Sequence, residues 1–195
     1  MNDNKKAMRK LKLQVDISVD GCIAGPNNEM DWLICEDDCM KCIDDIAESV
    51  DTIIMGRKMV DEFISHWSSR MNKSDDPWNA FAKKMIEIPK IVFTKTLTKS
   101  NWINTEIAKG DLKDEITKLK DQDGEDILVY GGASFDSSLI KEKLVDEFYL
   151  LVVPIVFGKG KTIFKDLKEI QKLTLIESKV FDGGLVLLHY EVKKN

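Results

Sequence analysis

The chain has 195 residues, of which 43% are hydrophobic and 32% are charged, a composition that is typical of a folded globular protein and excludes a disordered chain. Its formal net charge of −5, without a basic stripe, argues against a nucleic-acid-binding protein. The length suits one hydrophobic core, so we predict a flexible N-terminal tail over residues 1–8 and a single domain over residues 9–195.

Nothing in the sequence resembles a targeting or membrane segment. Residues 1–10 are polar and lack the apolar core of a signal peptide. The longest apolar stretch, Phe148–Phe157, is about half the length of a membrane-spanning helix and contains Pro154. We therefore expect a cytoplasmic protein that has no membrane partner.

The predicted elements alternate between strands and helices along the chain. Leu11–Val19 alternates apolar and polar residues, which predicts a strand with one buried face and a second face that carries Lys12, Gln14, Asp16 and Ser18. Further strands are predicted at Asp51–Met55, Lys90–Thr94, Asp126–Tyr130 and Val145–Val153. Helices are predicted at Glu36–Val50, Lys58–Ser65, Trp78–Ile86, Leu112–Lys120 and Ser134–Lys141.

The end of the chain has a different pattern. Leu173–Val180 and Leu185–Val192 flank Asp182-Gly183-Gly184, which predicts an antiparallel hairpin. Strands that alternate with helices and then a closing hairpin predict an α/β fold. Its sheet is expected to be mostly parallel, with an antiparallel C-terminal edge.

The cysteines do not predict a metal site. Cys35, Cys39 and Cys42 are spaced so that they share one face of a predicted helix. The only histidines are the isolated His66 and His189, and the cysteine spacing fits no common zinc pattern. We interpret the thiols as small apolar side chains on a buried helix face, and we predict no metal.

Three predicted strands end in residues that suit a phosphorylated ligand. One ends at the corner Gly131-Gly132, which leads directly into a helix whose free N–H groups suit phosphate. The other two are followed by Gly56-Arg57-Lys58 and by Thr94-Lys95. Because ligands bind at the carboxyl ends of the strands in an open α/β sheet, this set predicts a dinucleotide lying across the edge. The spare cations favour NADP over NAD.

Each of these features also has a simpler interpretation. Glycine pairs often serve only as tight turns, and Arg57-Lys58 could be a solvated basic pair. Gly158-Lys159-Gly160-Lys161 could hold a substrate phosphate, but it could equally be a flexible turn. Only the repetition of such residues on successive strand ends favours the ligand site.

Five short motifs occur in an order that resembles a known family. They are Ser18–Gly25, Asp31-Trp32, Met55–Lys58, Tyr130–Gly132 and Pro154–Lys161. From about Lys10 to Val192 the chain resembles the dihydrofolate-reductase superfamily. The closer branch is the reductase domain of the bifunctional riboflavin-biosynthesis deaminase/reductase, together with its stand-alone relatives.

The resemblance implies a fold with about eight mostly parallel strands and NADPH as the cofactor. It implies that Arg57 and Lys58, beside the cofactor-binding Gly56, grip the 2′-phosphate, while Thr94 and Lys95 border the adenosine side. It further implies that Ile23 and Ala24 lie against the nicotinamide. The pyrophosphate would be received by Gly131, Gly132, Ala133, Ser134 and Phe135.

The implied activity is transfer of a hydride from NADPH to a small heterocyclic substrate. A dihydrofolate or pteridine and 5-amino-6-(5-phosphoribosylamino)uracil are the leading substrate types, with Ser18 and Trp32 expected to contact them. The zinc-deaminase signature is absent, and no Asp-Asp-Pro stretch directly follows the second predicted strand, Asp51–Met55, where the riboflavin reductase is expected to carry one, so the substrate stays open. A homodimer is a further expectation.

Two carboxylates are candidates for the catalytic proton donor. Dihydrofolate reductases carry a helix carboxylate five residues after a tryptophan, and Asp37 has that spacing from Trp32. Acidic residues at a helix start also favour the helix dipole, which would explain Asp37 equally well. Asp16 on the first strand is the competitor, and a solvent-facing polar row is its simpler interpretation. The alternative function is a non-catalytic NADPH- or pterin-binding module.

Overall fold

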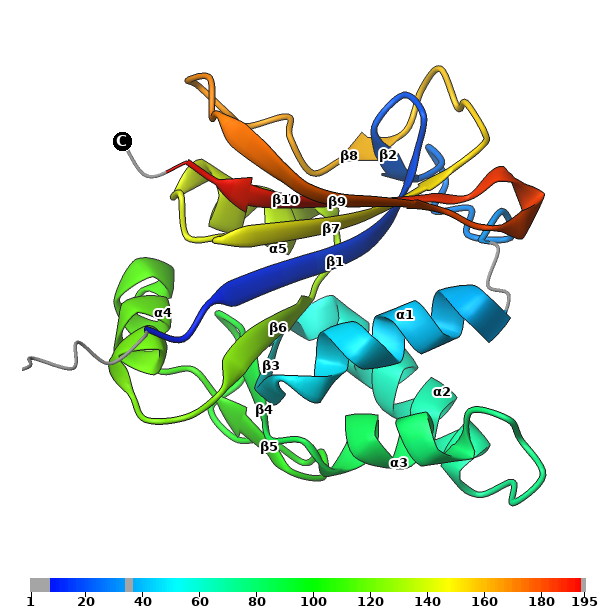
Figure 1. Ribbon diagram of the computed structural model, residues 1–195. Coiled ribbons are helices and arrows are strands. Elements are labelled where there is room, and N and C mark those ends of the chain that lie inside the picture. The colour runs from blue at the N-terminus through cyan, green and yellow to red at the C-terminus, as the bar shows by residue number, and fades with distance from the viewer. Residues whose placement is uncertain (1–7, 34–36, 194–195) are drawn as a thin grey trace, which may run out of the picture.

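The computed structural model describes residues 8–33 and 37–193, and its centre is an eight-stranded sheet (Figure 1). In chain order its strands are β1 (Leu11–Ser18), β3 (Val50–Gly56), β4 (Lys90–Phe93), β5 (Thr105–Ile107), β6 (Asp126–Tyr130), β7 (Glu147–Val153), β9 (Leu173–Val180) and β10 (Val186–Val192). A separate two-stranded sheet pairs β2 (Cys22–Ala24) with β8 (Lys161–Thr162). Except for Met8, the predicted N-terminal tail lies outside the described residues.

The spatial order of the strands is β5-β4-β3-β6-β1-β7-β10-β9. All neighbours from β5 to β7 pair in parallel, whereas β10 pairs antiparallel with both β7 and β9. The β9–β10 turn places Gly183 and Gly184 at φ of 72° and 83°, a region that L-residues other than glycine rarely enter. The predicted α/β fold and its antiparallel C-terminal edge are therefore confirmed.

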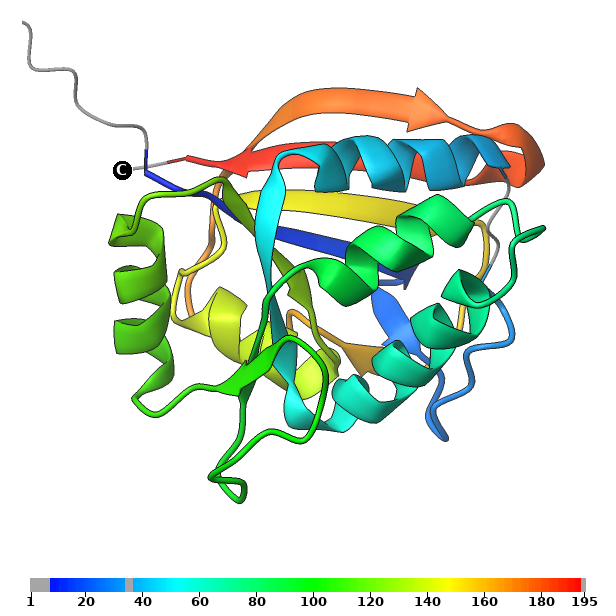
Figure 2. The ribbon, with the colours of Figure 1, turned by 90° about the horizontal axis from the view of Figure 1, so that it is seen from below.

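Five helices cover the two faces of the sheet (Figure 2). They are α1 (Asp37–Glu48), α2 (Val60–Met71), α3 (Asn79–Glu87), α4 (Leu112–Asp121) and α5 (Ala133–Lys141). Buried residues of α1, α2 and α3 form one core cluster, and those of α4 and α5 form the second. The two clusters therefore lie on opposite faces of the sheet, as in other α/β layers.

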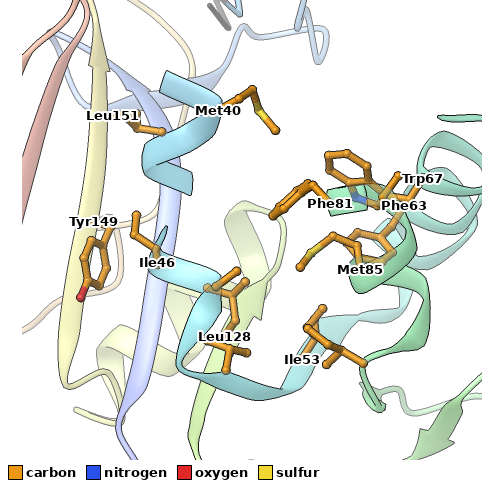
Figure 3. Close-up of a cluster of buried hydrophobic side chains, with 14 of the residues drawn as sticks. Met40, Ile46, Ile53, Phe63, Trp67, Phe81, Met85, Leu128, Tyr149 and Leu151 are labelled. Atoms are coloured by element: carbon orange, nitrogen blue, oxygen red, sulfur yellow. The ribbon is translucent and has the colours of Figure 1, made fainter. Parts of the chain in front are cut away.

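The core under α1–α3 is rich in aromatic rings, as Figure 3 shows. Trp67 of α2 makes edge-to-face contacts with Phe63 and with Phe81 of α3, at centroid distances of 6.3 and 5.1 Å. These rings pack beside Ile53 of β3 and Met85 of α3, both of which are almost fully buried. Contacts of this kind stabilise a core beyond the apolar area they remove from water.

The simpler interpretation of the polar residues on β1, a row that faces solvent, is wrong. Lys12 and Ser18 are buried on this strand, and Gln14 and Asp16 are only partly exposed. The reason is topological: β1 lies between β6 and β7 near the middle of the sheet, so helices or loops cover both of its faces. Polar residues that alternate with apolar ones along a strand can therefore be buried between neighbouring layers rather than exposed to solvent.

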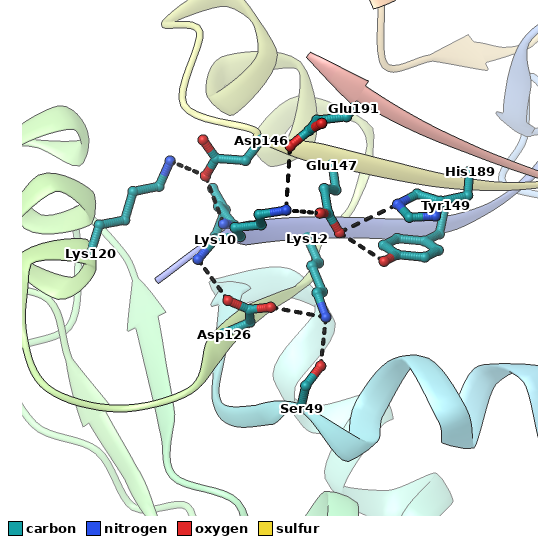
Figure 4. Close-up of polar contacts among 11 residues, drawn as sticks. Lys10, Lys12, Ser49, Lys120, Asp126, Asp146, Glu147, Tyr149, His189 and Glu191 are labelled. Atoms are coloured by element: carbon teal, nitrogen blue, oxygen red, sulfur yellow. Dashed lines mark hydrogen bonds and ion pairs between the residues drawn. The ribbon is translucent and has the colours of Figure 1, made fainter. Parts of the chain in front are cut away.

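A network of charged and polar groups joins the strands where β1 and β7 begin (Figure 4). Lys12 Nζ lies 3.0 Å from Asp126 Oδ2 and donates to Ser49 Oγ at 2.6 Å. Glu147 accepts hydrogen bonds from Lys10 Nζ at 2.5 Å and from the hydroxyl of Tyr149 at 2.7 Å. Burial opposes ionisation of Glu147, but these donors outweigh it and lower the pKa of its carboxyl. The network fixes β1 between its neighbours.

Several element boundaries differ from the predictions. Helix α2 continues to Met71, well beyond Ser65, and α1 is described from Asp37 because Glu36 lies outside the described residues. Strands β2, β5 and β8 were not predicted, since two or three residues are too short to show a period. No helix in the described part of the chain is both long and apolar enough to span a membrane.

Candidate functional site

A pocket of about 200 Å³ lies at the carboxyl ends of β1 and β6, two neighbouring parallel strands. Elements far apart in the sequence contribute its walls, including β1, β2, β6, β8 and the first residue of α5. The lining residues that bear on chemistry are Asp16, Ile23, Ala24, Gly131, Gly132 and Lys161. The structure therefore brings together predicted residues from both halves of the chain.

The absence of side chains at Gly131 and Gly132 lets other groups approach the backbone of this corner closely. A Cβ on Gly131 would lie 1.9 Å from Oδ1 of Asp136, so this position must be glycine for α5 to pack. A Cβ on Gly132 would meet only Met59, with its Sδ at 3.4 Å, so Gly132 leaves room on the pocket side. Gly132 also begins α5 without a side-chain cap, which leaves the first N–H groups of the helix available.

The end of β3 lies against the same helix. The Cβ of Phe135 would be 3.0 Å from a Cβ built on Gly56, and the Phe135 ring contacts Phe93 of β4 at 5.4 Å. The predicted residues Gly56 and Phe135 thus pack on each other, while Ser134 is exposed beside them. The side chain of Phe135 joins α5 to the ends of β3 and β4, and its N–H donates to the carbonyl of Gly132 at 2.9 Å.

Arg57 begins the short 3-10 turn η1 (Arg57–Met59) that follows β3. Its guanidinium lies 4.9 Å from the ring centre of Trp102 and donates to Asp61 Oδ2 at 3.0 Å. Trp102 donates its indole N–H to the other oxygen of Asp61 at 2.8 Å. These contacts hold the half-exposed side chain of Arg57 in one orientation at the end of β3, with its planar guanidinium against the indole ring of Trp102.

The remaining predicted cofactor residues, Lys58, Thr94 and Lys95, lie at the same sheet edge, where fewer side-chain contacts hold them in place. Lys58 and Lys95 are exposed, and neither makes an ion pair with another described residue. The hydroxyl of Thr94 accepts the N–H of Thr96 at 3.2 Å, which shapes the turn after β4. This end of the site therefore offers free positive charge on a surface turn.

Asp16 is the one carboxyl group among the described residues that line the pocket. Burial raises the pKa of its carboxyl to about 6, because few polar groups replace the water it loses. The neighbouring walls are largely apolar and include Ile23, Ala24 and Met59. A carboxyl that titrates near neutral pH inside an apolar pocket is the environment in which acids exchange protons with substrates.

Asp37, the other predicted proton donor, is exposed on the first turn of α1 and does not line the pocket. Its charge there faces the positive end of the helix dipole, the simpler of the two explanations considered for it. The structure therefore separates the two candidates, and only Asp16 lies where a pocket ligand would be.

The two predicted substrate residues have structural contacts. Ser18 is buried, and its hydroxyl accepts the N–H of Cys22 and donates to Asp20 at the β1–β2 turn. Trp32 donates its indole N–H to the carbonyl of Glu29 and contacts Phe157 edge-on at 5.4 Å. Neither side chain lines the pocket, so contact with a substrate stays a prediction.

Lys161 is the cation that the pocket does contain. It comes from β8, and its ammonium group contacts the side-chain oxygen of Asn28. The predicted phosphate turn therefore contributes its last lysine to the pocket, because β8 pairs with β2 and carries that residue inward.

Sequence reasoning missed Asp136, the fourth residue of α5. Its side chain has no exposed surface, and neither carboxyl oxygen has a hydrogen-bond partner. Burial raises the pKa of Asp136 to about 8. Helical periodicity could have found it, since Asp136 lies three and four residues before the buried Leu139 and Ile140 and so shares their face.

Other places in the molecule fit a site less well. A hollow of about 530 Å³ near Lys84 and Pro89 lies where β3 and β4 begin, at the opposite edge of the sheet from the strand ends that bind ligands in such folds. Within the described ranges, no three His, Cys, Asp or Glu side chains gather as metal ligands would, and Cys35 falls outside those ranges.

The family model of the RibD C-terminal domain matches residues 9–187 of the chain. A relative from Bacillus subtilis (strain 168), the uncharacterized protein YyaP, is 34% identical over 198 aligned residues. That alignment covers 97% of this chain and 98% of the relative.

Solved structures with the same fold fall into two groups. A riboflavin biosynthesis protein from Shewanella sp. PV-4 aligns with a TM-score of 0.75 and 24% identity over 95% of this chain and 99% of the other. Another is a Thermotoga maritima protein described as a diaminohydroxyphosphoribosylaminopyrimidine deaminase/5-amino-6-(5-phosphoribosylamino)uracil reductase. It aligns with a TM-score of 0.68 and 15% identity, over 95% of this chain but only 57% of the bifunctional protein.

The second group is represented by Enterococcus faecalis dihydrofolate reductase complexed with NADP(H). It aligns with a TM-score of 0.59 and 13% identity over 95% of this chain and 97% of the other. The predicted dihydrofolate-reductase-like fold is therefore confirmed, and so is the resemblance to the reductase domain of the riboflavin enzyme.

Proposed function

The chain belongs to the family of the RibD C-terminal domain, and from that membership we propose that it is an NADPH-dependent reductase of a small heterocyclic compound. The observation that carries the proposal is the pocket that joins the Gly131-Gly132 corner to the buried carboxyl of Asp16. The Gly131-Gly132 corner suits a phosphate, and the carboxyl of Asp16 suits a proton transfer. A dihydropteridine or a 5-amino-6-(5-phosphoribosylamino)uracil-type compound is the proposed substrate.

The described residues fit NADPH at two separated points. The start of α5 at Gly132 would receive the pyrophosphate, since no side chain caps it and a Cβ built on Gly132 would meet only Met59. Arg57 at the end of β3 would hold the 2′-phosphate, because a guanidinium binds a phosphate with two parallel hydrogen bonds. When bound, the nicotinamide would supply the hydride, and Ile23 and Ala24 would keep water from it.

Asp16 would hold the proton that such a reduction needs. A hydride added to a carbon–nitrogen double bond leaves a nitrogen that must take up a proton. A carboxyl whose pKa is near 6 carries a proton in a useful fraction of molecules at neutral pH. Lys161 at the pocket wall would balance a substrate phosphate or an enolate-like oxygen, as a mobile positive charge does.

The proposal is tested by the absorbance loss of NADPH when purified protein is mixed with dihydrofolate, other reduced or oxidised pterins, or the phosphoribosylaminopyrimidine. Turnover with one of these supports the reductase. NADPH binding without turnover on any of them would instead support the non-catalytic binding module, and the absence of both would reject the proposal.

Arg57→Ala tests the predicted choice of NADPH over NADH. We expect the dissociation constant for NADPH to rise at least about tenfold, because a charge-assisted contact to phosphate is worth roughly 1.5–3 kcal/mol. The affinity for NADH should change little, since that nucleotide has no 2′-phosphate. Titration of both nucleotides by calorimetry measures the two values.

The matched control for this experiment is Arg70→Ala. Arg70 also stacks on an indole, that of Trp78 at 4.3 Å, and bonds an aspartate, Asp76, but it lies at the far end of α2. Equal losses for NADPH and NADH in Arg57→Ala, or no loss at all, would show that Arg57 does not contact the 2′-phosphate.

A further inference from the structure

Three side chains from separate elements meet where β3 ends. Arg57 belongs to η1, Asp61 to the first turn of α2, and Trp102 to the connection between β4 and β5. Because β3 and β4 run parallel, with Gly56 paired to Phe93, the segments that follow the two strands leave the same edge of the sheet. The fold therefore brings Trp102 onto Arg57, although the two residues lie far apart in the sequence.

The carboxylate of Asp61 joins the other two side chains. One oxygen accepts the indole N–H of Trp102 at 2.8 Å, and the other accepts Nη1 of Arg57 at 3.0 Å. The indole N–H and, after it, the guanidinium lower the pKa of Asp61, so this carboxyl is ionised at neutral pH. Asp61 thus fixes the indole beside the guanidinium, whose central carbon lies 4.9 Å from the ring centre.

The effect of these contacts is to order the guanidinium rather than to stabilise the fold. The side chains of Arg57 and Asp61 are 37% and 65% exposed, and ion pairs between exposed side chains contribute little to stability. A long cationic side chain that stacks on a ring and bonds a carboxylate, however, loses much of its rotational freedom. Arg57 is therefore held in place before any ligand binds.

One edge of the ordered guanidinium is free. Among the described residues, Asp61 is the only hydrogen-bond partner of the Arg57 side chain, and it accepts from Nη1 alone. Nε and Nη2 therefore keep their N–H groups for another acceptor. Such an edge donates two parallel hydrogen bonds to a phosphate.

A second arginine on an indole, in the last turn of α2, differs in this respect. Arg70 lies 4.3 Å from the ring centre of Trp78, and both oxygens of Asp76 accept its Nη1, at 3.1 and 3.2 Å. Its Nε donates to His66 at 3.3 Å. Protein groups therefore occupy part of the edge that Arg57 leaves free, so the Arg70 stack is structural.

We propose that Trp102 is a positioning residue for the cofactor. Its indole, anchored by Asp61, holds the guanidinium of Arg57 with the free edge available to the 2′-phosphate of NADPH, and this sets the preference for NADPH over NADH. An arginine that is already ordered loses less entropy when it binds the phosphate. The proposal rests on the proposed function in its choice of cofactor and is independent of the substrate.

Calorimetric titration of Trp102 variants with NADPH and NADH tests the proposal. Trp102→Leu removes the flat face, and we expect the dissociation constant for NADPH to rise at least about threefold while that for NADH stays within about twofold. Trp102→Phe keeps a ring over the guanidinium and should recover most of the lost NADPH affinity. Trp102→Ser serves as the second variant without a ring if the leucine variant does not fold.

The Arg57→Ala background separates positioning from direct contact with the nucleotide. If Trp102 acts only through Arg57, adding Trp102→Leu to Arg57→Ala should change the NADPH dissociation constant by less than about twofold. An indole that stacked on the adenine instead would contribute equally to NADPH and NADH, with or without Arg57. Trp78→Leu, which removes the indole of the structural stack, is the control and should leave both affinities as in the wild type.

Three results would overturn the proposal: an NADPH affinity that Trp102→Leu leaves unchanged, an equal loss for NADPH and NADH, or a loss that persists without Arg57. In each of these cases the wild type still binds NADPH, so the proposed reductase is unaffected. A wild type that binds neither nucleotide would reject the choice of cofactor and this proposal together.

Discussion

Asp16→Asn is expected to lower kcat by roughly 10²–10⁴-fold while leaving NADPH affinity nearly unchanged, which is the usual range for loss of a positioned general acid. Asparagine has nearly the same shape as aspartate, so the pocket keeps its volume and walls. The amide, however, has no proton to give to the substrate nitrogen. Steady-state kinetics with the active substrate, combined with a nucleotide titration, separates the two effects.

The pH profile gives a second and sharper readout of the same residue. The acid form of Asp16 is present below its pKa of about 6 and disappears as the pH rises through that value. Wild-type kcat should therefore be flat below about pH 6 and fall toward tenfold per pH unit well above it. Asp16→Asn should lose this slope along with most of the rate.

Asp37→Asn is the matched control, because Asp37 was the other predicted donor and is exposed outside the pocket. We expect it to keep both the rate and the pH profile of the wild type. If Asp37→Asn loses the rate and Asp16→Asn keeps it, the assignment of the proton donor is wrong.

Asp136→Val is expected to stabilise the fold by several kcal/mol near neutral pH. In the wild type this carboxyl is fully buried without a hydrogen-bond partner, so it stays protonated in the folded chain up to about pH 8. In the unfolded chain it ionises near its ordinary pKa of 3.8. Valine removes a polar group that loses its hydration on folding and receives nothing in return.

The sign of the pH dependence follows from these two values. Because the folded state binds the proton more tightly, the wild type loses stability as pH rises from about 4 to about 8, by roughly 1.4 kcal/mol per pH unit. The variant lacks this loss. The difference in unfolding free energy between Asp136→Val and the wild type should therefore increase across that interval and level off above it.

Urea unfolding at several pH values measures this difference, and the contribution of Asp16 cancels because both proteins contain it. The control is Asp75→Val, at an exposed loop position, which should show no such trend. A difference for Asp136→Val that is negative or independent of pH would mean that its carboxyl has a partner or is ionised in the folded chain.

How much of this could be predicted from the sequence depends on what each residue contacts. The glycine corner after β6 and the basic residues after β3 were predictable, because strand ends at Tyr130 and Gly56 are set by local patterns and the parallel order places them at one edge. The antiparallel hairpin was predictable from its double glycine for the same local reason.

What the sequence could not predict depends on tertiary packing. The alternation of polar and apolar residues along β1 is equally compatible with a solvent-exposed polar face. The carboxyl of Asp16 is buried because β1 lies between β6 and β7 in the sheet. Lys161 enters the pocket through the two-residue strand β8, which has no periodic signal at all. The choice between Asp16 and Asp37 therefore needed the fold, since both fit the patterns available in the sequence.

The central claim is that the pocket beside Gly132 and Asp16 binds the nicotinamide end of NADPH. Calorimetric titration of the wild type with NADPH and NADH tests this claim most directly. We expect one saturable NADPH site per chain with a dissociation constant of about 1–100 μM, and NADH at least about tenfold weaker. No binding of either nucleotide at about 1 mM would contradict the account.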